Sequence, residues 1–253
     1  MQQMLKDKVI VITGGATGVG KAASLEFAKQ GAKVVMGDIA DAQESVEKIK
    51  AIGGEAIYVP TNLRKVADCK KLFDTAYETF GKIDGFFSYA GLTPVSPLDS
   101  CDEETFDAVT EVNYKAAFFC CQQAIKYMRM NGGGSIVLTG SPHAWSGEKD
   151  RCAYACTKGV LRVLNDHIAH HYSADGIRCN YLTLGWTPTE GELALRKTQN
   201  ETEEQLRKRA AGFIPIGRMC EVNDYLTSLV LMLSDTTAVM TGSVLRCTGG
   251  LYM

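Results

Sequence analysis

The 253-residue sequence lacks any long hydrophobic run. The apolar stretch in MQQMLKDKVIVITGG is too short for a signal-peptide core or a membrane span. No other window approaches the roughly 18 apolar residues that a spanning helix needs. The sequence therefore predicts a soluble, cytoplasmic protein with no membrane partner.

An excess of charge of either sign is also missing. Lys and Arg together number 27 against 29 Asp and Glu, which gives a formal net charge of −2. A nucleic acid or an anionic membrane surface is bound by a clearly basic surface. The composition thus predicts neither partner, and its 45% of hydrophobic residues is typical of a soluble globular protein.

The cysteines lack the pattern of a disulfide framework. They number nine, which is odd, and no C-x-x-C pair occurs among them. We predict reduced thiols that serve as small apolar side chains. Three histidines, His167, His170 and His171, have no acidic or cysteine partners in a metal-ligand pattern, so we predict no metal site.

What the sequence does contain is a regular alternation of short apolar runs and helical patterns. The predicted strands are 9–12, 33–36, 56–59, 85–88, 135–139, 178–184 and 243–247. The predicted helices are 21–29, 42–51, 66–80, 104–130, 154–172 and 223–233. Strict alternation predicts an α/β fold with a parallel sheet and helices on both faces. Because no linker interrupts it, we expect one domain over residues 1–253.

One polar, helix-prone segment, 189–211, stands apart from this alternation. It follows the sixth predicted strand, a position that suits a mobile lid over a substrate site. The alternative is a solvated surface helix.

A glycine-rich turn follows the first predicted strand. Gly14 permits a tight turn, Gly18 lets the backbone approach a pyrophosphate, and Gly20 lets the following helix pack on the strand. Asp38 ends the second strand, 18 residues after Gly20. A carboxylate there binds ribose hydroxyls and repels a 2′-phosphate, and Ile39 supplies no positive charge. The pattern predicts NAD rather than NADP; the alternative for Asp38 is a turn-forming role.

Tyr154 and Lys158 lie four residues apart, on one face of a predicted helix. A nearby ammonium lowers the pKa of a phenol and makes it a usable proton donor and acceptor. Ser141 lies thirteen residues before Tyr154, at the end of a predicted strand, and Asn113 lies on the preceding long helix.

Together these features resemble the short-chain dehydrogenase/reductase family over essentially the whole chain. The motifs are TGGATGVG, GDIA, SYAG, EVNYKAA, GSIVLTGS, YACTK, RCNYLTLGWTPT, PIGR and TGSVLRCTGG. The resemblance implies a single Rossmann-type, doubly wound domain with a seven-stranded parallel sheet. It also implies an oxidoreductase that moves a hydride between nicotinamide and an alcohol or ketone carbon, and a homotetramer or homodimer.

The resemblance further implies a catalytic tetrad of Asn113, Ser141, Tyr154 and Lys158. In it Tyr154 is the general acid and base, Ser141 polarises the carbonyl, Lys158 lowers the pKa of Tyr154 and Asn113 positions a water. The expected cofactor-binding residues are Gly14, Thr17, Gly18, Val19, Gly20, Asp38, Ile39, Asn62, Leu63, Ala90, Gly91, Tyr154, Lys158, Gly185, Thr187 and Thr189.

The sequence also departs from the family pattern. Ser88-Tyr89 replaces a pair of asparagines, Asn62-Leu63 replaces Asp-Val, Leu184 stands where a proline is usual, and Thr248 stands where an aspartate is usual. None of these changes removes a member of the tetrad, so the resemblance still implies an active enzyme.

The substrate is predicted from fewer residues. Both tryptophans, Trp145 and Trp186, fall in segments that border the expected substrate pocket, as do His143 and Arg151. With Ser141 and Tyr154 they suit a small sugar, polyol or related hydroxy compound. The alternative for Trp145 is that it packs a loop. Two other hypotheses remain: an acyl-thioester or steroid ketoreductase, and a catalytically idle NAD-binding protein.

Overall fold

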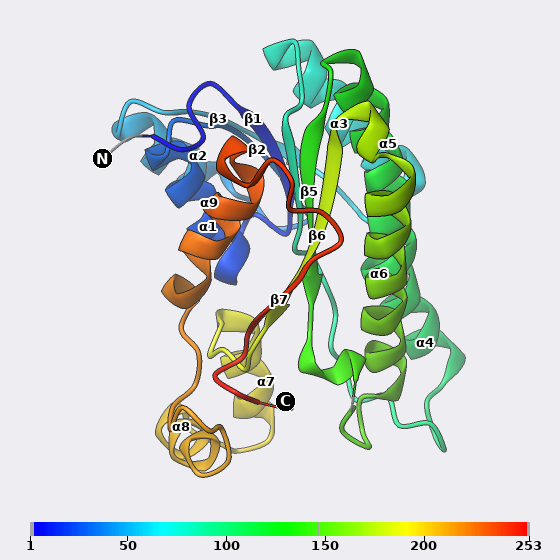
Figure 1. The fold of residues 1–253 in the computed structure, drawn as a ribbon. Helices are drawn as coiled ribbons and strands as arrows, with labels where there is room; N and C mark the ends of the chain where they lie inside the picture. The colour runs from blue at the N-terminus through cyan, green and yellow to red at the C-terminus, as the bar shows by residue number, and fades with distance from the viewer. Residues whose placement is uncertain (1–2, 146, 252–253) are drawn as a thin grey trace.

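Seven short segments form one sheet in the computed structural model, which describes residues 3–145 and 147–251. The strands are β1 (Val9–Thr13), β2 (Lys33–Asp38), β3 (Glu55–Pro60), β4 (Gly85–Ser88), β5 (Gly134–Gly140), β6 (Ile177–Leu184) and β7 (Val244–Cys247). They pair in parallel in the order β3-β2-β1-β4-β5-β6-β7 (Figure 1). The predicted seven-stranded parallel sheet is confirmed.

Helices cover both faces of the sheet. One group comprises α1 (Gly18–Lys29), α2 (Gln43–Ala51) and α9 (Leu226–Leu233), and the other α3 (Val66–Phe80), α5 (Ala116–Met130) and α6 (Cys152–His171). Figure 1 shows the two groups on opposite sides of the sheet. Because successive side chains of a strand point to opposite faces, Val9 and Val11 pack under the second group while Ile10 and Ile12 pack under the first. This double burial explains why the strands are apolar throughout.

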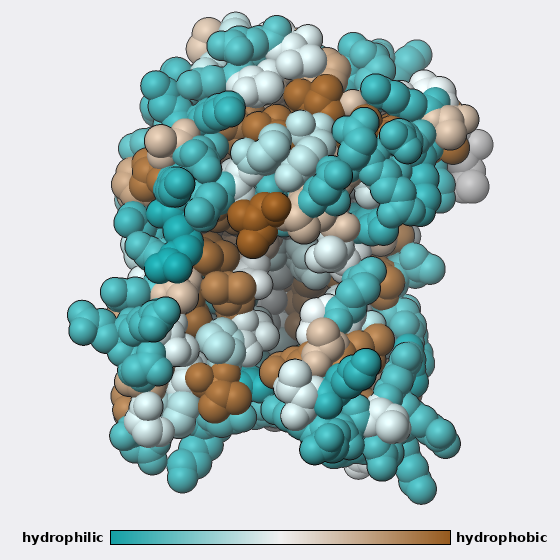
Figure 2. All heavy atoms as spheres, turned by 180° about the vertical axis from the view of Figure 1, so that it is seen from behind, coloured by the Kyte–Doolittle hydropathy of each residue, from teal (hydrophilic) through white to brown (hydrophobic). Residues whose placement is uncertain are grey.

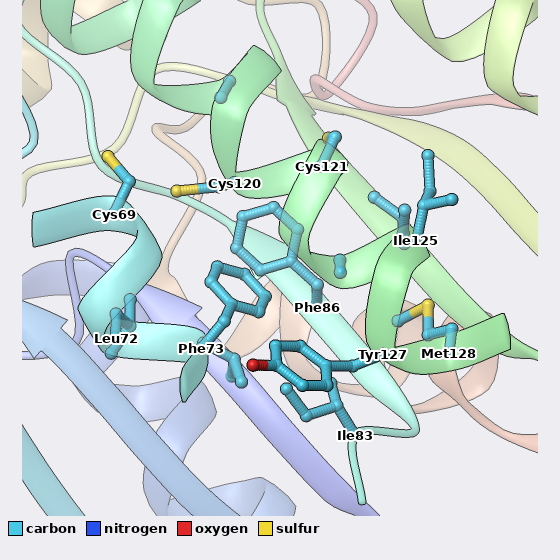
Figure 3. Close-up of a cluster of buried hydrophobic side chains, with 14 of the residues drawn as sticks. Cys69, Leu72, Phe73, Ile83, Phe86, Cys120, Cys121, Ile125, Tyr127 and Met128 are labelled. Atoms are coloured by element: carbon cyan, nitrogen blue, oxygen red, sulfur yellow. The ribbon is translucent and has the colours of Figure 1, made fainter. Parts of the chain in front are cut away.

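The core between α3, α5 and the sheet is drawn in Figure 3. Phe73 of α3 meets Phe86 of β4 edge to face, with ring centroids 5.2 Å apart. Cys69 and Cys120 are fully buried beside them. All nine cysteines are free thiols. Their buried members therefore fill space in the core, as small apolar side chains do.

The predicted long helix over 104–130 is wrong as a single element. The structure divides it into α4 (Glu103–Thr110), a π-helical turn (Glu111–Lys115) and α5. The extra residue in a π turn re-aims one side chain without a change in the apolar pattern. Here it brings Asn113 against Leu92, whose N–H donates to Asn113 Oδ1 at 2.7 Å and whose carbonyl accepts from Nδ2 at 2.9 Å.

The polar segment 189–211 forms two helices, α7 (Glu190–Thr198) and α8 (Glu203–Ala211). The Thr189 hydroxyl caps α7 and the Thr202 hydroxyl caps α8, each accepting a backbone N–H from the first turn. Leu206 and Ala210 of α8 are buried in a small cluster against which Trp186 packs. The segment is therefore anchored by a small hydrophobic cluster that is separate from the two cores beside the sheet.

Every parallel strand ends at the same edge of the sheet, so the segments that follow the strands meet there. β1 and β4 are neighbours, and the chain runs outward from them in opposite directions. A crevice at such a reversal is where open α/β sheets bind ligands. Across the described ranges, no helix has both the length and the apolar character needed to cross a membrane.

Candidate active site

A cavity of about 530 Å3 lies at this edge of the sheet. Figure 2 shows the molecule from behind, with a hollow near its centre that has apolar residues on its walls. The predicted site residues that line the cavity are Gly14, Thr17, Gly18, Val19, Asp38, Ile39, Asn62, Leu63, Ala90, Gly91, Ser141, His143, Arg151, Tyr154, Lys158, Gly185, Trp186, Thr187 and Thr189. Three others, Gly20, Asn113 and Trp145, lie outside its wall.

The glycine-rich turn has the shape that a pyrophosphate needs. Gly14 has a φ of +79°, which favours glycine, and a Cβ there would lie 2.9 Å from the backbone of Ala90. A Cβ on Gly20 would lie 2.0 Å from the Gly14 carbonyl oxygen, so Gly20 serves close packing rather than ligand contact. Helix α1 begins at Gly18, the side chain of its N-cap residue Thr17 makes no capping hydrogen bond, and its first turn contains no acidic residue. This N-terminus fits an anionic ligand.

Two side chains that the sequence did not predict reach this N-terminus. Glu190 Oε2 accepts from the Gly18 N–H at 2.9 Å, and the Tyr89 hydroxyl accepts from the Val19 N–H at 3.3 Å. Tyr89 could have been suspected, because it occupies one of the departures from the family pattern. Nothing in the sequence indicated the role of Glu190, because it lies 172 positions from Gly18.

Asp38 lines the cavity and is held by two backbone N–H groups. Its Oδ2 accepts from the Ala16 N–H at 3.0 Å and its Oδ1 from the Ala40 N–H at 3.1 Å. Arg64 also lines the cavity, a positive charge that sequence reasoning overlooked. Its Nε forms an ion pair with Glu111 Oε2 at 2.7 Å, so the Arg64 charge already has a partner.

Tyr154 and Lys158 both face the cavity from α6. The Lys158 ammonium donates to the Thr139 carbonyl at 2.9 Å and lies 5.6 Å from the Tyr154 ring centroid. Burial lowers the pKa of Lys158 to about 8. Burial raises the pKa of Tyr154 to about 12, although a hydrogen bond with Ser141 opposes the shift. The lowered pKa expected for Tyr154 is therefore not found here, because desolvation of the phenolate outweighs the neighbouring charges.

Ser141 and Asn113 are fixed by the backbone around them. Ser141 Oγ accepts from the His143 N–H at 3.2 Å, and the Ser141 N–H donates to the Tyr181 hydroxyl at 3.3 Å. Asn113 lies behind Gly91, where a Cβ would be 3.3 Å from Asn113 Oδ1. The Asn113 amide is thus placed to shape the wall rather than to touch a ligand directly.

The other end of the cavity is rich in polar side chains. Trp186 Nε1 and Arg196 Nε both donate to Glu192 Oε1 at 2.7 Å, and all three side chains line the cavity. The His143 ring meets the Tyr154 ring edge to face, with centroids 5.7 Å apart. Glu192 and Arg196 were missed from the sequence because nothing in a polar helix indicates which of its residues face inward. Phe213, in the turn after α8, was missed as well.

Trp145 packs elsewhere. Its ring lies 4.6 Å from the Arg246 guanidinium and 5.8 Å from that of Arg162, and it meets Tyr181 edge to face. This is the alternative stated above, in which Trp145 packs a loop. In α6 the His171 ring is tilted against the His167 ring and meets the His170 ring edge to face. The described residues hold no cluster of three or more potential metal ligands.

Comparisons with known proteins extend these observations. The profile of the family described as enoyl-(acyl carrier protein) reductase matches residues 14–252. An uncharacterised oxidoreductase of Thermotoga maritima is 35% identical, over 96% of each chain. The L-rhamnose 1-dehydrogenase (NAD(P)+) of Azotobacter vinelandii is 32% identical, over 99% of this chain and 98% of its own length.

A solved structure is similar over its whole length. The 3-ketoacyl-(acyl-carrier-protein) reductase from Brucella melitensis, complexed with NADH, superposes with a TM-score of 0.87 at 25% identity. The match covers 98% of this chain and 100% of that one. The glycine-rich turn, the N-terminus of α1 and Asp38 fit a nicotinamide dinucleotide. The chain belongs to the short-chain dehydrogenase/reductase family and is an oxidoreductase that acts on CH–OH groups with a nicotinamide cofactor.

Proposed function

We propose that the protein is an NAD-dependent oxidoreductase that interconverts a secondary alcohol and a ketone on a small polar substrate. The observation that carries the proposal is the convergence of Ser141, Tyr154 and Lys158 on the cavity that also holds the glycine-rich turn. We propose these three residues as the catalytic group, with Asn113 as a positioning residue behind the cavity wall.

Tyr154 moves the proton at the substrate oxygen. With a pKa of about 12 it carries its proton at neutral pH and can donate it to a ketone oxygen. Ser141 donates a hydrogen bond to the same oxygen and so favours the charge that develops there. In alcohol oxidation the phenol must first lose its proton, which the nearby Lys158 ammonium favours. The hydride acceptor or donor is the nicotinamide ring when the cofactor is bound.

The preference for NAD rests on Asp38. Its carboxylate lines the cavity and suits the two hydroxyls of the adenosine ribose, whereas a 2′-phosphate would meet like charge. Arg64 is the cation that would favour NADP, but it is paired with Glu111. Gly14, Gly18 and Val19 would hold the pyrophosphate, and Thr187 and Thr189 the nicotinamide end.

A small polar substrate is supported by the charged and hydrogen-bonding side chains at the Tyr154 end of the cavity, and by the relative that acts on L-rhamnose. An acyl-thioester ketoreductase is the second candidate, supported by the similarity to the Brucella melitensis enzyme. A panel of polyols, sugars, hydroxy acids, steroids and acyl thioesters, followed by NADH absorbance, tests both. Turnover confined to bulky ketones or acyl thioesters would reject the polar substrate.

We propose a single domain with a lid over 189–211. Gly191, Glu192 and Arg196 of α7 form part of the cavity wall, so movement of α7 would change access. We also propose a cytoplasmic homodimer or homotetramer. Apolar side chains stay exposed on α5 and α6, with Phe118 at 41% and Val163 at 64%, and a partner subunit would cover them.

A further inference from the structure

We infer that the substrate carries a carboxylate close to the reacting hydroxyl, and that the Arg151 guanidinium binds it. This inference rests on the proposed function and narrows it from a small polar compound to a small hydroxy acid.

Arg151 is a buried charge with a weak partner. It is 5% exposed and lines the cavity. Its contacts are to Asp150, whose carbonyl and Oδ2 both lie 3.5 Å from Nη1. By contrast, Arg196 meets Glu192 at 2.7 Å in the same cavity. A buried charge is costly unless it is paired at close range, so Arg151 is poised for a further anion.

The remaining donors of Arg151 match a carboxylate. Within the described ranges, Nε and Nη2 make no hydrogen bond to the protein, while Nη1 is shared with Asp150. A guanidinium presents such nitrogens in a rigid fork that binds the two oxygens of a carboxylate at once. A hydroxyl group would use one of these donors and would leave the charge uncompensated.

The backbone holds Arg151 in place. The Ser96 N–H donates to the Asp150 carbonyl at 2.8 Å, and the Cys152 N–H donates to the Ser96 carbonyl at 2.9 Å. These two bonds bracket Arg151 and tie its segment to another loop. A binding group on such a fixed segment loses little freedom when the ligand arrives.

Arg151 lies directly before α6, three residues from Tyr154. Three residues advance a helix by about 4.5 Å, and the Arg151 charge is near enough to the Tyr154 phenol to oppose the rise of its pKa. A substrate that reaches both must hold its carboxylate a few bonds from its hydroxyl carbon.

The other charged groups at this end of the cavity do not replace the proposed ligand. Glu192 is occupied by Trp186 and Arg196. Glu148 also lines the cavity, but it is exposed and forms no ion pair with Arg151 in the part of the chain that the structure describes. Neither carboxylate therefore neutralises Arg151.

The experiment compares acids with their uncharged amides. The probes are 2-hydroxybutyrate, 3-hydroxybutyrate and 4-hydroxypentanoate, each a secondary alcohol, and the three matching hydroxyamides. NADH formation gives kcat/KM for each, and tryptophan fluorescence in the presence of NADH gives binding without turnover. We expect at least one acid to exceed its amide by about tenfold or more in both readouts.

Three variants test whether the preference for the acid depends on Arg151. Arg151→Gln should lose the preference for the acid, mainly through a higher KM for the acid, so that the ratio of acid to amide kcat/KM falls toward one. Arg246→Gln is the matched control, because Arg246 is exposed and packs on Trp145 outside the cavity wall. Arg151→Lys keeps the charge and should restore part of the preference, which covers the case in which Arg151→Gln does not fold.

Equal binding and turnover of acids and amides by the unaltered enzyme would overturn the inference. So would an acid preference that survives Arg151→Gln. Either result leaves the proposed function intact if polyols or sugars are oxidised. Conversely, acid-selective binding without NADH formation from any alcohol in the panel would support the anion site and contradict the proposed function.

Discussion

The Glu190 carboxylate accepts a hydrogen bond from the backbone N–H of Gly18 at 2.9 Å. Glu190 is the first residue of α7 and Gly18 the first residue of α1, so the contact joins the proposed lid to the glycine-rich turn. The N–H that Glu190 uses belongs to the helix N-terminus expected to bind the cofactor phosphates. Glu190 and a phosphate would therefore compete for one donor, with like charges opposed.

Removal of this carboxylate should tighten cofactor binding. We expect Glu190→Ala to lower the Kd for NAD about threefold to tenfold, since charge effects at a helix terminus are typically below about 1–2 kcal/mol. Fluorescence titration measures the Kd. Glu204→Ala, an exposed carboxylate of α8, is the control and should leave it unchanged. A Kd that stays the same or rises in Glu190→Ala would show that the contact does not oppose cofactor binding.

Asp38 should decide the choice of cofactor. The unaltered enzyme should bind NAD clearly more tightly than NADP, and Asp38→Ala should narrow this gap by about tenfold, because it removes both the ribose acceptor and the repelling charge. Titration of both dinucleotides against both proteins gives the four constants. Equal affinities in the unaltered enzyme would reject the assignment to Asp38.

Lys158 should reduce stability in a pH-dependent way. Burial lowers its pKa from 10.5 to about 8. Below pH 8 both the folded and the unfolded chain bind the proton, so the folded state bears the full cost of a buried ammonium. Between pH 8 and 10.5 the folded state releases the proton first, so this cost falls as the pH rises.

Lys158→Met should therefore raise the free energy of unfolding by about 2 kcal/mol at pH 7, given about 1.4 kcal/mol per pKa unit and the loss of the donor to Thr139. The advantage of the variant should shrink as the pH approaches 10. Urea unfolding at pH 7, 8, 9 and 10 measures it. An advantage that does not change with pH would mean that Lys158 is not held with a lowered pKa.

The exposed apolar face of α6 should be an interface. Light scattering at micromolar concentration should find a dimer or a tetramer. Val163→Glu should shift the population toward smaller species, because a charge would be buried without a partner. Val239→Glu, a substitution at a loop residue that is 96% exposed, should not. A monomeric unaltered protein would contradict the proposed assembly.

Much of this arrangement could be predicted because it depends on short-range spacing. The apolar runs that became β1 and β2 are buried on both faces, so their periodicity is clear. The positions of Asp38, Tyr154 and Lys158 follow from where a strand ends or from one helical turn. These relations span few residues and survive folding unchanged.

What could not be predicted depends on tertiary packing. The π turn around Asn113 adds a residue without altering the apolar pattern of the helix. Trp145 and Trp186 both belong to sequence segments that were expected to border the site. In the structure Trp186 lines the cavity, whereas Trp145 packs against Arg246 and Arg162 outside it. The Glu190 contact links residues 172 positions apart, and no local rule indicates it.

Turnover by Tyr154→Phe tests the central claim most directly. The measurement is the rate of NADH formation with the best substrate of the panel, with the Kd for NAD determined on the same samples and Tyr172→Phe, at the far end of α6, as the control. The account predicts that Tyr154→Phe lowers turnover by about a thousandfold and leaves the Kd for NAD within about twofold, because only the proton-transfer group is lost. Turnover near that of the unaltered enzyme would contradict it and would place the acid and base elsewhere.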